Sequence, residues 1–233
     1  MYLIDKSKCA EVFQRTIKIE LIKTILDTLN LSGRLISVCN HSIRVGYRMV
    51  QYAINHGTNE FGYDLKWSED ELTLIMATGL LHDCGKDVSP LEILERKGLL
   101  TAEEFRIHIL PHPVRSAKLT DHFRTAKLSY DLRLLPDCVE GHHNWKKIGG
   151  YPNPFPKSIR ELVINSDEWK IAWIQQYACL ADFSDAFVTR TDRAKQSNDV
   201  DIAGVVTKFF SGETEVLGFA VQDIGLTLAL RVV

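Results

Sequence analysis

A histidine and an aspartate stand side by side at His82 and Asp83, in the segment HDCGK. The apolar run TLIMATGLL precedes them and predicts a helix that ends at this pair. Hydrolysis of a phosphate ester at neutral pH needs a strong nucleophile and neutralised phosphoryl charge, and two neighbouring divalent ions supply both. Asp83 can place one oxygen on each ion, and Lys86 can reach a phosphoryl oxygen. We therefore expect metal-assisted hydrolysis at this segment.

Further ligand-type residues occur at several distances along the chain. His142 and His143 form an adjacent pair ahead of a Gly/Pro-rich loop, and His112 lies between two prolines, where regular structure gives little reason for histidine. Asp182 stands at the end of an otherwise apolar helix, and His41 lies early in another. An isolated His-Asp pair would equally fit a helix cap or a buried histidine. A helical bundle, however, can bring all of these side chains to one metal centre.

The elements that must position these residues are predicted to be helices. Apolar residues at three- and four-residue steps over 12–29 indicate an amphipathic helix, and a second helix is expected over about 34–55. Capping boxes begin at Ser68 and Thr101, and Ser166 can cap a later helix. No strand alternation precedes the last forty residues, whose pattern fits either a strand or a buried helix. We therefore expect an all-α fold.

Composition limits the kind of protein and its surroundings. The chain has 233 residues, of which 45% are hydrophobic, so it can bury a sizeable core. The formal net charge is -2 and the basic residues are scattered, which argues against DNA as a partner. We find neither a signal peptide nor an apolar run of membrane-spanning length, and the five cysteines form no C-x-x-C pair. We expect a soluble cytoplasmic protein with no membrane contact.

Taken in order, these motifs closely resemble the HD-GYP domain over roughly residues 35–195. The chain carries His41, then HDCGK, then ILERKGLLTAEEF followed by His112, then HHNWKKIGGYP, then ADFSDAF. The family pattern reads approximately HD-x-G-K, L-x-K-x-G-x-L-T-x-E-E with a later histidine, H-H-E with G-Y-P eight residues after the first histidine, and A-D-x-x-D-A. The distance from HH to GYP is preserved here.

The resemblance implies a fold and an activity. The fold would be an HD-domain helical bundle, with an N-terminal helical extension over 1–34, a catalytic domain over 35–195 and a C-terminal segment over 196–233 packed on that domain. The activity would be that of a phosphodiesterase that opens a cyclic dinucleotide, such as cyclic di-GMP or cyclic GMP-AMP, with a metal-bridging hydroxide. A homodimer or a signalling partner protein is also expected.

The resemblance also implies roles for individual residues. Two divalent ions are expected, iron or manganese first, with zinc, nickel and magnesium also compatible. Asp83 and Lys86 would be catalytic, with Asp83 bridging the ions and Lys86 contacting the scissile phosphate. Trp145, between the histidine pair and GGYP, could stack on a base. The expected metal ligands are His41, His82, Asp83, His112, His142, His143 and Asp182, and the expected substrate-binding residues are Lys86, Trp145, Gly150, Tyr151 and Pro152.

Four departures from the family pattern bear on the substrate. Asn144 replaces a glutamate, Lys147 and Ile148 replace an Asp-Gly pair, Ser37 replaces a third-metal glutamate, and Ser116 replaces a glycine. Two alternatives therefore stay open, namely a phosphohydrolase acting on a mononucleotide and a catalytically weak ligand-binding module. Asp185, the second aspartate of ADFSDAF, is expected to contact a ligand residue or cap the helix rather than bind metal.

Overall fold

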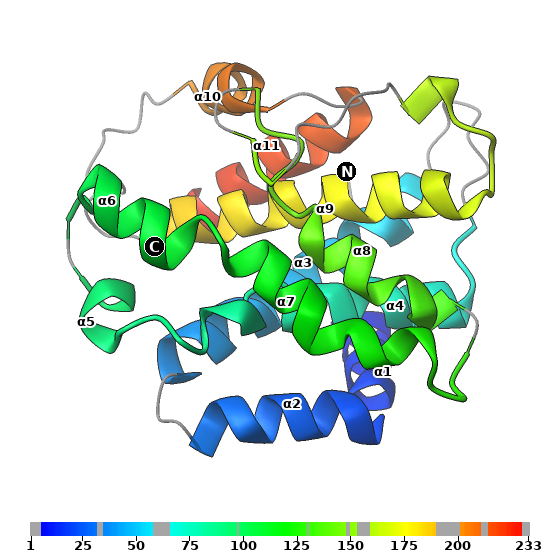
Figure 1. Cartoon of the computed structure of the whole chain (residues 1–233). Coiled ribbons are helices and arrows are strands. Elements are labelled where there is room, and N and C mark those ends of the chain that lie inside the picture. The colour runs from blue at the N-terminus through cyan, green and yellow to red at the C-terminus, as the bar shows by residue number, and fades with distance from the viewer. Residues whose placement is uncertain are drawn as a thin grey trace.

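The computed structural model describes residues 6–31, 35–57, 66–96, 98–129, 131–147, 150–152, 159–189, 201–210 and 214–229. These ranges contain helices and no strand, and their one isolated β-bridge joins Lys146 to Phe210. The expected all-α fold is confirmed (Figure 1). Ile148, Gly149 and the side chain of Ser37 lie outside the described residues.

The long helices form the frame of the molecule, and short helices and 3-10 turns connect them. The longer elements are α1 (Lys6–Thr16), α2 (Glu20–Leu31), α3 (Leu35–Gly57), α4 (Glu69–Leu81), α7 (His112–Thr120), α9 (Asp167–Thr189), α10 (Ile202–Phe209) and α11 (Thr214–Ala229). The shorter ones are α5 (Leu91–Leu94), α6 (Ala102–Glu104) and α8 (Leu135–Glu140). A five-residue π-helix, Phe105–Ile109, continues α6 towards α7.

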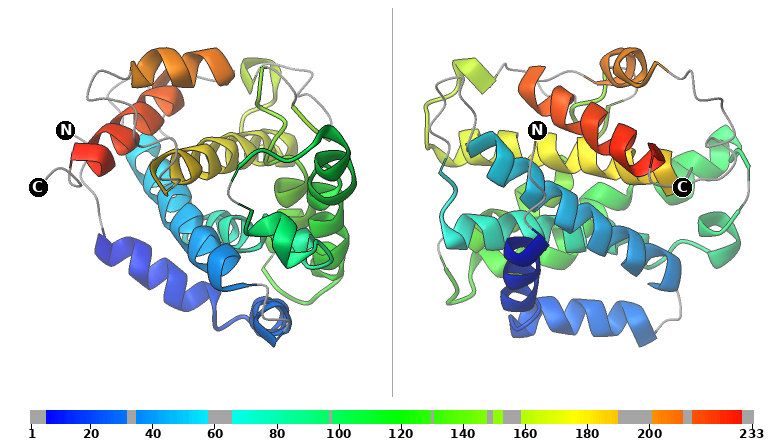
Figure 2. Two further views of the ribbon diagram at one scale, coloured as in Figure 1. Left: turned by 90° about the vertical axis from the view of Figure 1, so that its left-hand side faces the viewer. Right: turned by 180° about the vertical axis from the view of Figure 1, so that it is seen from behind.

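Several local predictions are confirmed, and one is wrong. Both capping boxes are present, at Ser68 and at Thr101, and the Ser166 hydroxyl accepts a hydrogen bond from the Trp169 amide. The single helix expected over 12–29 is instead two helices, α1 and α2, separated by a turn over 17–19 and crossing at a steep angle (Figure 2). The apolar stripe runs through both helices, so its periodicity does not mark the break. The ambiguous C-terminal stretch contains the helices α10 and α11.

The centre of the bundle is built from α3, α4 and α9. Helix α4 is buried without interruption from Leu72 to Leu81, so it lies inside the bundle, as its uniformly apolar sequence requires. It touches α3 at a pair of glycines, where a methyl group on Gly79 would lie 2.3 Å from the Gly46 Cα. Only glycine permits such a close approach of two helix backbones. The contact joins the middle of α3 to the end of α4.

The N-terminal and C-terminal helices share the central core. Cys9 and Val12 of α1 and Phe219 and Ile224 of α11 belong to the same cluster of buried apolar side chains as α4. Helix α11 packs against α9 and α3, on the side away from α2 (Figure 2). Of the helices described, none has the length and hydropathy to cross a membrane. The boundaries at 34 and 195 stay predictions.

Candidate metal centre

The HDCGK segment forms a tight turn at the end of α4 and is attached to α7. Gly85 lies so close to α7 that a methyl group there would meet the His112 carbonyl oxygen at 2.3 Å. Ser116 stands where the family pattern has glycine. Its hydroxyl donates to the His82 carbonyl at 2.7 Å and accepts from the Gly85 amide at 2.9 Å. This substitution therefore adds two hydrogen bonds between the turn and the helix that carries His112.

Three of the expected ligands are oriented by the same local device. The Nδ1 of His82 contacts the Gly79 carbonyl at 2.8 Å. In the same way, His112 contacts the Ile109 carbonyl and His142 the Val139 carbonyl, each at 2.6 Å. A carbonyl oxygen only accepts, so each imidazole must donate from Nδ1. In the neutral ring, Nε2 is then left as a bare lone pair available to a metal.

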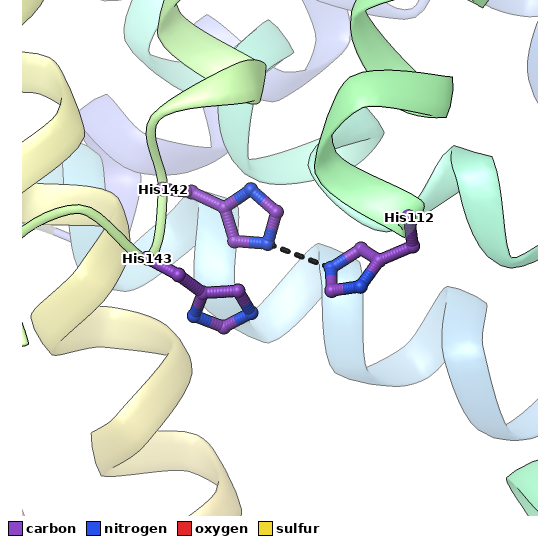
Figure 3. A group of neighbouring side chains, drawn as sticks. All are labelled: His112, His142 and His143. Carbon is purple, nitrogen blue, oxygen red and sulfur yellow. Dashed lines mark hydrogen bonds between the residues drawn. The ribbon is translucent and has the colours of Figure 1, made fainter. Parts of the chain in front are cut away.

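These lone pairs point at one another in the interior. The Nε2 atoms of His112 and His142 lie 3.0 Å apart, with His143 beside them (Figure 3). Among the described residues, the buried His82 Nε2 and His143 Nδ1 have no hydrogen-bond partner. Buried polar atoms are rarely left unpaired, and two facing lone pairs repel. The arrangement fits a bound cation. Without a cation, these histidine nitrogens would have no partner for their lone pairs.

Asp83 lies between two groups of nitrogens. Its Oδ1 is 3.1 Å from His112 Nε2 and 4.0 Å from His142 Nε2. Its Oδ2 faces the other way, 3.5 Å from His82 Nε2 and 3.8 Å from His41 Nε2. We call the residues on the side of Oδ1 the His112 half, which consists of His112, His142 and His143. We call those on the side of Oδ2 the His41 half, which consists of His41, His82 and Asp182. One carboxylate thus offers a different oxygen to each half.

Two aspartates of α9 contact His41, and one of them, Asp182, completes the His41 half. His41 Nε2 lies 3.1 Å from Asp182 Oδ1, and Asp182 Oδ2 is 3.7 Å from His143 Nδ1. The Nδ1 of His41 contacts Asp185 Oδ2 at 2.7 Å. Asp185 is fully buried, and its second oxygen accepts a 2.7 Å hydrogen bond from Arg44. Asp185 therefore orients His41 from behind, in agreement with its expected role.

The electrostatics suit metal ligation near neutral pH. Burial lowers the pKa values of His82 and His112. Burial is also the main reason why the pKa values of His142 and His143 lie well below the ordinary value. Burial raises the pKa of Asp83, but nearby His82 and Lys86 outweigh it and hold the value well below the ordinary range. Neutral imidazoles therefore surround an ionised carboxylate.

In the absence of metal, the pKa of His41 is shifted in the opposite direction from the pKa values of the other four histidines of the centre. Burial lowers its pKa, but the hydrogen bonds to Asp182 and Asp185 outweigh that effect and raise the pKa to about 9. A protonated His41 donates to both aspartates. A metal ion at Nε2 would take the place of one proton.

The donor set fits two first-row divalent ions. His112, His142 and His143 each offer a ligand atom within 4.8 Å of the others, and so do His41, His82 and Asp83. Imidazole with carboxylate suits manganese, iron and zinc better than calcium or magnesium, which prefer oxygen-only sets. All seven expected ligands thus converge.

The expected substrate-binding residues differ from one another in their contacts and their burial. The Lys86 amine is 2.6 Å from Asp83 Oδ2, and the Tyr151 ring stacks at a tilt on His143 with centroids 4.6 Å apart. Gly150 and Pro152 flank Tyr151 and are half-buried. Trp145 is only 5% exposed and belongs to the core, and its stacking role stays a prediction.

Phe105 was missed by the sequence reasoning. It lies on the π-helix, is 39% exposed, and meets Tyr151 edge to face with ring centroids 6.0 Å apart. The segment LTAEEF contained it, but no motif position gave the aromatic ring a role. The bulge that turns it towards Tyr151 is visible only in three dimensions, and π-helices are frequent at functional sites.

Comparison with known proteins gives one family. The HD domain matches residues 38–190, a range that contains every candidate ligand. No curated protein matches the chain. With the match covering more than half of its length and the His/Asp groups gathered as described, the chain belongs to the HD domain family of metal-dependent phosphohydrolases.

Proposed function

We propose that this protein is a two-metal phosphodiesterase that hydrolyses a cyclic dinucleotide. The observation that carries the proposal is the placement of Asp83, whose two oxygens face two different groups of imidazole nitrogens. Such a carboxylate can bridge two ions a few ångströms apart. The order of the sequence motifs, with GYP eight residues after HH, supports a cyclic dinucleotide as the substrate.

The residues present fit a division of roles. The seven candidate ligands would hold two divalent ions, iron or manganese, which when bound supply the nucleophile and neutralise phosphoryl charge. Lys86 contacts Asp83 in this structure and is 20% exposed at its side chain. With Asp83 serving as a metal ligand, the Lys86 amine would be available to hold a phosphoryl oxygen. The lysine thus links occupancy of the centre to substrate binding.

The rim of the centre fits a nucleotide base. Tyr151 packs on His143, Phe105 approaches Tyr151 from solvent, and the Lys146 amine lies 5.6 Å above the Tyr151 ring. Phe105 is 39% exposed and offers an accessible aromatic face to a base, whereas Tyr151 is only 8% exposed, and a nearby amine attracts phosphate. We assign Phe105 to the base, with Tyr151 supporting its ring, and Lys146 to the second phosphate of the cyclic dinucleotide.

The alternative substrate is a mononucleotide, because the matched family is the HD domain in general and Asn144 replaces the family glutamate. Hydrolysis of cyclic di-GMP, cyclic GMP-AMP and a panel of nucleoside monophosphates by the manganese-loaded and iron-loaded protein separates the two. Turnover of a cyclic dinucleotide with about two metals per chain supports the proposal. Turnover of monophosphates alone assigns the alternative, and metal binding without any turnover contradicts both.

A further inference from the structure

A row of charged groups connects the C-terminal helix α11 to the metal centre. Asp223 of α11 accepts a 2.7 Å hydrogen bond from Arg48 Nε on α3. The Nη1 of the same arginine lies 3.4 Å from Asp185 Oδ1, and Asp185 contacts His41. The helix lies outside the matched range 38–190, alongside α3 and α9 (Figure 2). The row therefore runs from a segment that the family match does not include to a candidate ligand.

A second contact holds Asp223 in place. The Tyr52 hydroxyl lies 3.0 Å from Asp223 Oδ2 and 3.2 Å from the Ser184 hydroxyl. A hydroxyl has one proton and a carboxylate only accepts, so Tyr52 donates to Asp223 and accepts from Ser184. Ser184 directly precedes Asp185 on α9. Asp223 is thus tied to α3 through Arg48 and Tyr52, and Tyr52 in turn contacts α9 at Ser184, next to Asp185.

The charges show what Asp223 contributes. Asp185 Oδ1 is shared by Arg44 and Arg48, while its Oδ2 serves both His41 and Arg44. Asp223 gives Arg48 a second acceptor and limits its attraction to Asp185. Without Asp223, the mostly buried Arg48 would have Asp185 as its one carboxylate among the described residues, and a closer pairing would draw Asp185 away from His41.

We propose that Asp223 is a positioning residue for the metal centre, which keeps Arg48 from competing with His41 for Asp185. The inference rests on the proposed metal centre. Its consequence is that the C-terminal segment completes the His41 half, whereas the His112 half does not depend on it. Removing a direct partner of a ligating histidine typically costs 10- to 100-fold in metal affinity, and Asp223 acts on that partner, Asp185, only through Arg48, so we expect about tenfold.

The test measures Mn²⁺ binding to the full-length protein by calorimetry with chelator competition. Asp223→Asn should weaken one of two binding events about tenfold and leave the other unchanged. The matched control is Glu71→Gln, which removes an ion pair with Lys170 of similar burial: 14% and 16% exposed, against 16% and 12% for Asp223 and Arg48. This control should bind both ions as the wild type does.

A double variant tests the cause. In Arg48→Gln/Asp223→Asn the competing charge of Arg48 is gone. The affinity for the ion that Asp223→Asn binds more weakly should therefore recover to within about twofold of the wild-type value. Tyr52→Phe removes a hydrogen bond to Asp223 without changing charge, so it should slightly weaken binding of the same ion. This variant replaces Asp223→Asn in the test if Asp223→Asn does not fold. Equal loss at both ions, no loss, or no recovery in the double variant overturns the inference alone. A wild-type protein that binds no Mn²⁺ overturns the metal centre as well.

Discussion

The two halves of the centre differ in how one of their histidines is held. In the His112 half, His112 and His142 are oriented by carbonyls three residues earlier in their own segments. In the His41 half, the Gly79 carbonyl orients His82 in the same way, but the ring of His41 depends on Asp185, which comes from another helix and is shared with Arg44 and Arg48. Main-chain contacts between residues three apart form locally, whereas the ion pairs of Asp185 require α3 and α9 to be packed together. We therefore expect the His41 half to be the more easily perturbed.

The largest effect should come from the residue common to both halves. Asp83→Asn keeps the shape of the side chain but removes the charge that both ions share. We expect phosphodiesterase activity to fall by at least about a thousandfold, as for other single groups that act as part of a unit. Steady-state hydrolysis with metal analysis checks this. Retention of both metals and of turnover would show that Asp83 is not a bridge.

Asp185→Asn should separate the halves. The asparagine retains an acceptor for His41 but lacks the negative charge, so the ion of the His41 half should bind roughly 10- to 100-fold more weakly. The second ion serves as the internal control, since His112 and His142 are held by main-chain carbonyls, which no substitution removes, and neither contacts Asp185. Competition between Mn²⁺ and a chelator measures both affinities. Equal weakening at both would contradict the proposed difference between the halves.

Phe105→Ala tests the rim above the His112 half. Loss of one aromatic contact with a base costs about 1–3 kcal/mol, so we expect KM for the cyclic dinucleotide to rise at least fivefold with kcat little changed. Ile107→Ala is the matched control, because Ile107 is similarly exposed on the same π-helix. A rise in KM of the same size in both variants would remove the stacking role.

Ser116→Ala tests how firmly the HDCGK turn is attached to α7. The variant leaves the buried Gly85 amide without its acceptor, so the free energy of unfolding should fall by about 1–3 kcal/mol. Urea denaturation of the metal-free protein measures this loss. Ser116→Gly, which introduces the residue of the family pattern, removes the same hydrogen bonds and should be no more stable than the alanine variant.

The smallest effect concerns an ion pair remote from both halves. Burial raises the pKa of Glu71, but hydrogen bonds from Lys170 and Ser68 outweigh it and leave the pKa below its ordinary value. The stabilisation is therefore fully present above about pH 4.3, the pKa of an unfolded glutamate, and is lost as the pH falls through the folded value. Glu71→Gln should cost about 1 kcal/mol at neutral pH.

The pH dependence supplies the check on that variant. Urea denaturation of the wild type and of Glu71→Gln should give a difference that shrinks as the pH is lowered from about 5 to about 2. A difference independent of pH would mean that the capping contact with Ser68, rather than the charge on Glu71, provides the stabilisation. Binding of both metals should be the same in the two proteins.

The sequence predicts what is local and misses what is long-range. His82, His112 and His142 could be named because residue type and spacing mark them, and the capping boxes at Ser68 and Thr101 depend only on residues three apart. The contact between Arg48 and Asp223 joins positions far apart in the chain, and no periodicity encodes it. Trp145 could not be placed, because a loop position does not reveal whether its ring faces the core or the solvent.

The glycine contact between α3 and α4 bears on ion selectivity. His41 lies five residues before Gly46 and His82 three residues after Gly79, so both ligands are carried by backbones already in contact. The two helices cannot approach further, and the packed core around Met76 resists their separation. The spacing between the segments that carry His41 and His82 is therefore nearly constant, which would disfavour an ion as large as Ca²⁺ on geometric grounds, in addition to its preference for oxygen ligands. Discrimination by ionic radius would then originate in the packing of two residues that never touch the metal.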